Sequence, residues 1–224
     1  MNNDLIRQFD SIEFAENPET RCPCVLLLDT SGSMDGEKIK ALNHGLRTFQ
    51  QALQSDELAA QRVEVGIVTF GPVHLAQEFM SAQQFEAPTL KAQHATPMGQ
   101  AVEKAVKMIE ERKKSYQLNG IGYYRPWVFL ITDGEPTDDI STAAHLVQNG
   151  EESKAFMFFA VGVDGARMEV LQELSVRQPL KLRELRFKQL FQWLSSSLSA
   201  TSKSHSGIVP LSNPATPDGW ATTE

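Results

Sequence analysis

Oxygen-bearing side chains follow two apolar runs of this sequence, and another one precedes a predicted helix. Asp29, Ser31 and Ser33 alternate with other residues directly after an apolar run, and Asp133 ends a second run. Thr96 lies just before a predicted helix. None of these side chains offers sulfur or imidazole, and hard cations such as Mg²⁺ prefer all-oxygen ligands. The set therefore indicates a Mg²⁺ site, with Mn²⁺ or Ca²⁺ as substitutes.

Short apolar runs alternate along the chain with stretches that have one apolar face. Buried parallel strands read as continuous apolar runs, whereas surface helices repeat apolar residues every three to four positions. Residues 72–80 follow the preceding run through Gly71-Pro72, which predicts a hairpin and an antiparallel edge strand. We expect strands at 24–29, 63–71, 127–134, 155–163 and 180–182, and helices near 39–53, 97–109, 137–150, 167–174 and 187–198.

Alternating strands and helices predict an α/β fold. Its central sheet should be doubly wound and mostly parallel, with one antiparallel edge strand and helices on both faces, as in Rossmann-like folds. Ligands of such sheets bind beyond the carboxyl ends of the strands, near the point where the strand order reverses. We divide the chain into an N-terminal segment (1–20), a domain (21–202) and a tail rich in Pro, Ser and Thr (203–224), which either packs on the domain or extends from it.

Helix starts can be predicted from capping residues. Thr96 should cap the second long helix, with Pro97 at its first position. Thr137 should cap the next helix, where Asp138 and Asp139 would lie in the first turn and Gly150 would follow the end. Asp29 and Ser33 could instead cap the helix that follows them, because Asp and Ser are both common helix caps. The presence of Thr96 and Asp133 makes a metal site the better interpretation for them.

Composition excludes several functional classes. The 224 residues carry a formal net charge of −7, which disfavours nucleic-acid binding. Neither a membrane-spanning apolar run nor a signal peptide is evident. Cys22 and Cys24 are too few for a zinc site and too close for an unstrained disulfide, so we expect free thiols and a cytoplasmic protein. A basic cluster, which is either a solvated face or a docking patch, comprises Lys181, Arg183, Arg186 and Lys188.

Three segments together resemble the von Willebrand factor A (VWA) domain family. "DTSGS" resembles the D-x-S-x-S signature of its metal-ion-dependent adhesion site (MIDAS), "ATPMG" its threonine loop and "ITDGEPTD" its second aspartate loop. The resemblance covers residues 20–200 and implies that Ser31, Ser33 and Thr96 bind the metal directly. It implies that Asp29 and Asp133 bind directly or through water.

Other stretches are similar to a narrower group of the family. Residues 120–138 and the segment "FKQLFQWLSSSLSATSKS" resemble small bacterial VWA proteins associated with tellurite resistance, the TerY-like group. This resemblance implies a cytoplasmic stress-response or phage-defence setting. It also implies that the protein functions together with a kinase and a phosphatase that are encoded in the same gene neighbourhood.

The donor set itself favours binding over catalysis. Neutral hydroxyls leave the charge of a divalent cation partly uncompensated, so the cation attracts an Asp or Glu side chain of a protein partner. Metal occupancy and partner binding would then strengthen each other. We expect a non-catalytic interaction module. The alternatives are a metal-dependent phosphohydrolase that uses Asp29 as its nucleophile, which is disfavoured because Ser31 replaces the second acid, and a scaffold without metal dependence.

Overall fold

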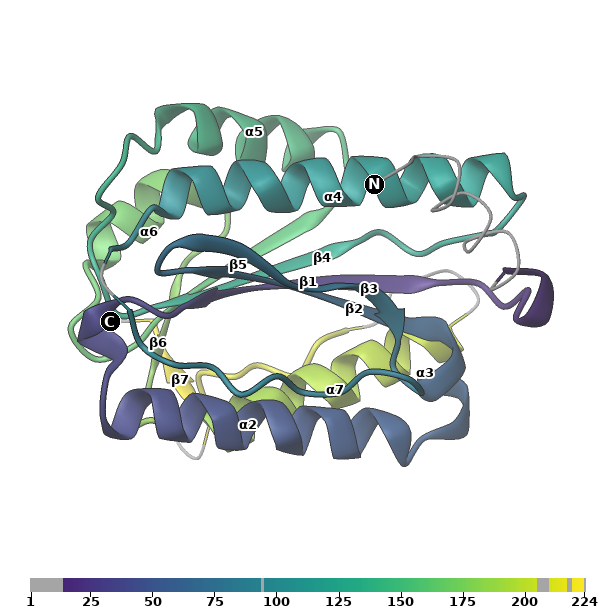
Figure 1. The fold of residues 1–224 in the computed structure, drawn as a ribbon, viewed down its shortest axis with the longest axis horizontal. Coiled ribbons are helices and arrows are strands. Elements are labelled where there is room, and N and C mark those ends of the chain that lie inside the picture. Colours follow the sequence, from purple (N-terminus) through teal and green to yellow (C-terminus); the bar gives the residue numbers. More distant parts are fainter. Residues whose placement is uncertain (1–13, 94, 205–209, 217–218, 224) are drawn as a thin grey trace.

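A seven-stranded sheet forms the centre of the protein, with helices on both faces (Figure 1). The computed structural model describes residues 14–93, 95–204, 210–216 and 219–223, so most of the N-terminal segment and part of the tail lie outside the described residues. The strands lie in the order β3-β2-β1-β4-β5-β6-β7. They are β1 (Cys22–Asp29), β2 (Val63–Phe70), β3 (Val73–Ser81), β4 (Trp127–Thr132), β5 (Met157–Gly162), β6 (Leu180–Leu182) and β7 (Ala221–Thr222).

The sheet is buried because apolar side chains of β1 alternate between two cores. Leu26 and Leu28 pack into the core beneath α2 and α7, whereas Val25 and Leu27 pack into the core beneath α4, α5 and α6. A strand buried on both faces needs apolar residues at every position, which explains its continuous run. The helices are α2 (Glu37–Gln54), α3 (Glu57–Arg62), α4 (Met98–Leu118), α5 (Ser141–Glu152), α6 (Met168–Leu174) and α7 (Phe187–Lys203).

The predicted fold class is confirmed, with one correction at the edges of the sheet. β3 pairs antiparallel with β2, as the hairpin predicts. A second antiparallel edge strand, β7, pairs with β6, so the prediction of a single one was wrong. A two-residue strand is too short to show any periodicity. The tail segment around it packs on the domain: Trp220 is buried, and its ring lies 5.6 Å from that of Trp193.

Two helix starts differ from the predictions. α4 begins at Met98, and Asp138 rather than Thr96 accepts hydrogen bonds from the free backbone N–H groups of its first turn, at Gly99 (3.1 Å) and Gln100 (2.8 Å). α5 begins only at Ser141, so Thr137 does not cap it, and Asp138 and Asp139 both precede its first turn. A cap from another segment cannot be read from local spacing.

The predicted end of α5 was also wrong. Gly150 lies inside the helix rather than beyond it. A Cβ at this position would lie 2.2 Å from the ring of Phe156, so this glycine allows close packing and does not mark a helix end.

The amino ends of the strands carry a buried ionic network and two free thiols. Glu64 accepts hydrogen bonds from Arg21, Arg112 and Tyr116. Cys22 and Cys24 are both fully buried. Burial, and secondarily the charge of Glu64, raises the pKa of Cys22 to about 12. The charged groups and the thiols at this end of the sheet are therefore buried.

Candidate functional site

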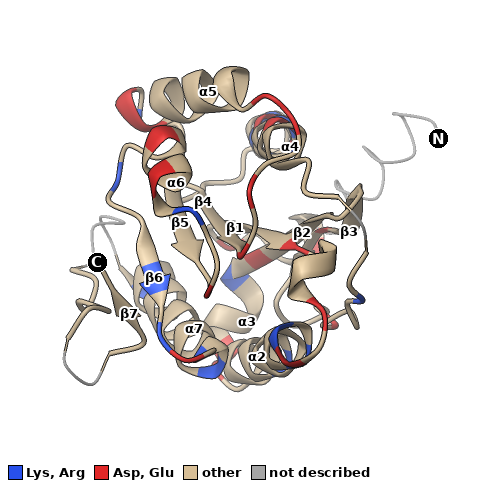
Figure 2. Cartoon of the chain, turned by 90° about the vertical axis from the view of Figure 1, so that its left-hand side faces the viewer, with Lys and Arg blue, Asp and Glu red and all other residues tan. Residues whose placement is uncertain are grey.

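The opposite end of the sheet contains the point where the strand order reverses. β1 lies between β2 and β4, parallel to both, and Leu28 of β1 is paired with Ile131 of β4. The carboxyl ends of β1 and β4 therefore bring Asp29 and the loop that begins at Asp133 next to each other. Figure 2 looks onto this end of the molecule.

The loop after β1 is fixed by its own polar groups. The backbone N–H of Ser31 donates to Asp29 Oδ1 at 2.7 Å. A single 3₁₀ turn, Gly32–Met34, follows and brings Ser33 back, so that the Oγ atoms of Ser31 and Ser33 lie 2.9 Å apart. The three alternating oxygen side chains thus form one connected group.

The loop after β4 joins this group. Ser33 Oγ donates to Asp133 Oδ1 at 2.6 Å, although the two residues are a hundred positions apart in the chain. Thr132, the last residue of β4, donates its hydroxyl proton to Asp29 Oδ2 at 2.5 Å and accepts from the backbone N–H of Gly134 at 3.1 Å. Hydrogen bonds therefore link both aspartates across the two neighbouring strands.

Thr96 reaches the same place from the segment before α4. Its backbone N–H donates to Thr137 Oγ1 at 3.2 Å, and its carbonyl accepts from the Thr137 N–H at 2.9 Å. A Cβ on Gly134 would lie 3.3 Å from Thr96 Oγ1 and 3.5 Å from Asp29 Oδ2. Both oxygens thus border the space that the missing side chain of Gly134 leaves open.

The structure brings all five predicted side chains together. Ser33 is exposed, whereas the other four are buried, so the cluster is a mostly desolvated group with one open side. The cluster has only two carboxylates, and no group of three or more His, Cys, Asp and Glu side chains that could hold a metal ion occurs among the described residues.

The electrostatics of the cluster are dominated by its two carboxylates. Burial raises the pKa of Asp29, and the nearby charge of Asp133 adds to this, while hydrogen bonds from Ser31 and Thr132 partly oppose it. Lys38, in the first turn of α2, places Nζ 2.6 Å from Asp133 Oδ2. The Lys38 ammonium group therefore compensates part of the negative charge of the two carboxylates.

Sequence reasoning missed three residues that hold this cluster: Lys38, Thr132 and Thr137. Thr132 gave a usable signal, because a hydroxyl at the end of an otherwise apolar buried strand must find a hydrogen-bond partner. The sequence signal at Lys38 is weaker. Lys38 lies five positions after Ser33, where the first helical turn points back toward the strand ends.

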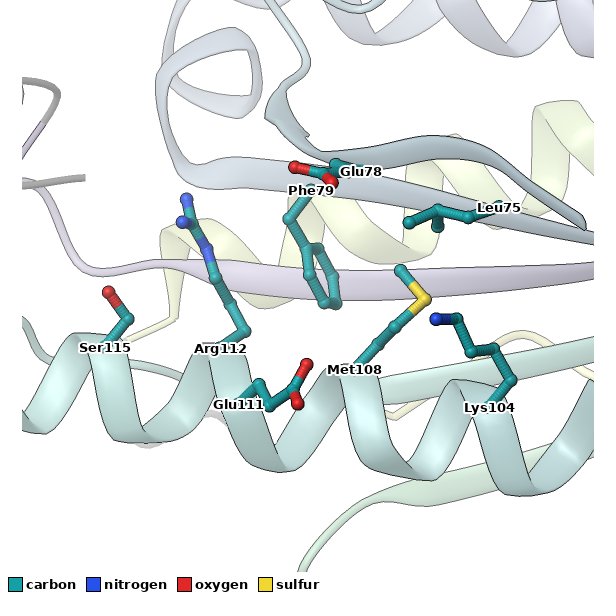
Figure 3. A pocket seen from close by; sticks show the side chains of 8 residues that line it. All are labelled: Leu75, Glu78, Phe79, Lys104, Met108, Glu111, Arg112 and Ser115. Atoms are coloured by element: carbon teal, nitrogen blue, oxygen red, sulfur yellow. The ribbon is translucent and has the colours of Figure 1, made fainter. Parts of the chain in front are cut away.

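A groove that is separate from the cluster lies between β3 and α4 (Figure 3). Its volume is about 270 Å³, and the side chains of Leu75, Phe79 and Met108 line its apolar floor. Arg112, at one end, is already engaged by Glu64. Because the groove offers none of the five clustered oxygen side chains, we give it no part in the site.

Comparison with known proteins agrees with this geometry. The family model of the von Willebrand factor type A domain matches residues 24–188. The chain belongs to the VWA family. VWA domains are modules of protein interaction and adhesion, and the family-level expectation is therefore confirmed.

Solved structures show the same VWA fold at low sequence identity. The pilus adhesin SpaC of Lactobacillus rhamnosus GG has a TM-score of 0.65 at 13% identity, over 80% of this chain and 30% of the adhesin. Proximal thread matrix protein 1 of the mussel byssus has a TM-score of 0.57 at 16% identity, over 81% of this chain and 48% of that protein. This chain thus spans less than half the length of either protein. No curated protein matches its sequence.

Proposed function

We propose that this VWA domain is a non-catalytic, Mg²⁺-dependent module that binds a protein partner through an acidic side chain. The observation that carries the proposal is the convergence of Asp29, Ser31, Ser33, Thr96 and Asp133 at the reversal point of the sheet. Three hydroxyls and two carboxylates fit a hard divalent cation. A bound cation would supply the positive charge that attracts the partner's carboxylate.

The residues divide the work of holding such a cation. Asp29 and Asp133 provide negative charge, and Ser31, Ser33 and Thr96 provide neutral oxygens. Thr132 orients Asp29, and Thr137 fixes the segment that carries Thr96. Because Ser33 is on the exposed side, a partner carboxylate would approach there.

The cellular setting of the proposal rests on sequence resemblance. The TerY-like pattern favours a cytoplasmic bacterial protein of stress, tellurite-resistance or phage-defence systems. A kinase or phosphatase of the same gene neighbourhood is then a candidate partner. Among the described residues, no helix is long and apolar enough to cross a bilayer.

A phosphohydrolase that uses Asp29 is the weaker alternative. Both carboxylate oxygens of Asp29 already accept hydrogen bonds, from the Ser31 N–H and the Thr132 hydroxyl. These bonds make a carboxylate a poorer nucleophile. Turnover of a generic phosphate ester that Asp29→Asn abolishes would establish the enzyme and overturn the non-catalytic module.

The proposed function predicts metal-dependent capture of a partner. Immobilised protein should retain at least one cellular protein in Mg²⁺ and release it in EDTA, because removing the cation removes the attraction for the partner's carboxylate. Ser33→Ala should lose the same protein, since it deletes one oxygen on the exposed side of the site. Identical retained proteins in Mg²⁺, in EDTA and on Ser33→Ala would contradict the proposal.

Lys38 should compete with the cation. Its ammonium group neutralises Asp133, so a divalent cation must displace it. Lys38→Met is therefore expected to raise the affinity for Mn²⁺, measured without partner, about tenfold, equivalent to about 1.4 kcal/mol.

Lys40→Met is the matched control for Lys38→Met. Lys40 is exposed in the same helix and is paired with Glu37, so its replacement should leave Mn²⁺ affinity unchanged. Weaker Mn²⁺ binding by Lys38→Met than by wild type would show that Lys38 supports the site rather than competing for it.

A further inference from the structure

A basic pocket opens beside the proposed metal site. Its volume is about 570 Å³, and it lies between the start of α2, the loop after β5 and the segment that joins β6 to α7. Four of its lining side chains are cationic and two are acidic. They are Lys38, Lys181, Arg183 and Arg186, and Asp164 and Glu184.

Lys38 belongs to both the pocket and the cluster. It lines the pocket, yet its Nζ contacts Asp133 Oδ2, and about a quarter of its side chain (24%) remains exposed. A Cβ on Gly165, in the loop after β5, would lie 3.7 Å from the same Nζ. The two sites are therefore adjacent and share one positive charge.

The wall of the pocket has an unusual backbone. Glu184 (φ 45°) and Leu185 (φ 56°) both adopt the left-handed conformation without being glycine. Each such residue strains the chain, and strain of this kind persists where the surrounding structure enforces it, often at functional sites. Here the Arg183 N–H donates to the Trp220 carbonyl at 2.9 Å, and the Arg186 N–H donates to the Arg183 carbonyl at 2.8 Å. The bond from Arg183 thus ties the arginine-bearing wall to Trp220, a buried residue of the tail.

The charge of the pocket is opposite to that of the whole protein. The chain has a net charge of −7, whereas four cations and two acids line this pocket. Arg186 pairs with Glu184 of the same wall at 3.6 Å, and Lys38 pairs with Asp133. Figure 2 shows basic positions at β6 and beside α7, interrupted by one acidic stretch, and acidic positions on α5 and α6. Such a local field attracts anions and orients an approaching partner.

We infer that this pocket is a second anion subsite for the same partner, which would present an acidic segment with at least two carboxylates. One carboxylate approaches the cation, and the other enters the pocket. With a divalent cation held by Asp133, Lys38 would lose its ion pair with that carboxylate and would be available to the second carboxylate. The inference rests on the proposed function, since the first carboxylate needs the metal.

A fluorescently labelled oligoglutamate peptide can test the subsite with and without metal. By anisotropy at low ionic strength, the wild-type protein should bind it in EDTA through the pocket alone. The double variant Lys181→Gln/Arg186→Gln should bind it about fivefold more weakly, because two cationic contacts are lost. Lys104→Gln/Lys107→Gln, which makes the same charge change on α4, should bind like wild type.

The two proposals fail in different ways. Equal binding in EDTA by the pocket variant and the α4 variant would overturn the subsite. Adding Mg²⁺ should strengthen peptide binding by wild type but not by Ser33→Ala. No strengthening of wild type by Mg²⁺ would overturn the proposed function, whatever the pocket variant does in EDTA.

Discussion

Asp29→Asn is expected to weaken Mn²⁺ binding by at least about a hundredfold, equivalent to about 2.7 kcal/mol. Asp29 supplies one of the two negative charges of the proposed site, and the hydroxyl residues cannot replace it. Asparagine keeps the size of the side chain and the oxygen that the Ser31 N–H contacts. Calorimetric or electron-paramagnetic titration of the isolated protein with Mn²⁺ measures the effect.

The same variant should remain folded without metal. The raised pKa of Asp29 means that burying its ionised form disfavours the folded state: the penalty grows as the pH rises above the ordinary value of 3.8 and is complete above the raised pKa. Neutral asparagine removes that penalty, so an undamaged thermal transition in EDTA separates lost binding from lost folding.

Asp35→Asn is the matched control for Asp29→Asn, because Asp35 lies in the same loop and is exposed. It should bind Mn²⁺ like wild type. Unchanged Mn²⁺ affinity of Asp29→Asn, or an equal loss in Asp35→Asn, would show that the metal assignment is wrong.

Glu64→Gln is expected to lower the free energy of unfolding by about 3–5 kcal/mol. Glu64 is fully buried; its Oε1 lies 2.8 Å from Arg21 Nε, and its Oε2 lies 2.8 Å from Arg112 Nε. Glutamine has nearly the same shape but leaves two buried guanidinium groups without a counter-charge. Urea unfolding followed by circular dichroism measures the loss.

Glu78→Gln on the neighbouring strand β3 is the control for Glu64→Gln, since Glu78 is exposed. It should change stability by no more than about 0.5 kcal/mol. A loss below about 1 kcal/mol in Glu64→Gln would show that the network is not needed for stability. The candidate site lies at the other end of β2, so Mn²⁺ affinity of the folded variant should not change.

Much of the fold was predictable because burial on both faces leaves a strong sequence signal. The continuous apolar run of β1 and the repeating apolar face of α7 each identify their element without reference to the rest of the chain. β7 could not be predicted, because two residues carry no period. α3 was missed for a similar reason, since six residues make less than two turns.

The composition of the cluster was predictable, but its internal contacts were not. One short segment contains Asp29, Ser31 and Ser33. Asp133 follows another parallel strand, and the carboxyl ends of parallel strands lie at the same edge of the sheet. The bond from Ser33 to Asp133 and the pairing of Thr96 with Thr137 depend on how distant loops meet. Likewise, Asp138 was expected in α5 and instead caps α4, because the three-dimensional neighbour of a carboxylate is not its neighbour in sequence.

The burial of both native cysteines makes the protein convenient for site-specific labelling. Alkylating dyes and spin labels react with exposed thiolates, and a thiol with a pKa of about 12 that is sealed from solvent is almost never ionised near neutral pH. A single cysteine introduced on the surface would therefore be the preferred target, with Cys22 and Cys24 left in place. A probe near the mouth of the basic pocket could then report the arrival of a ligand directly.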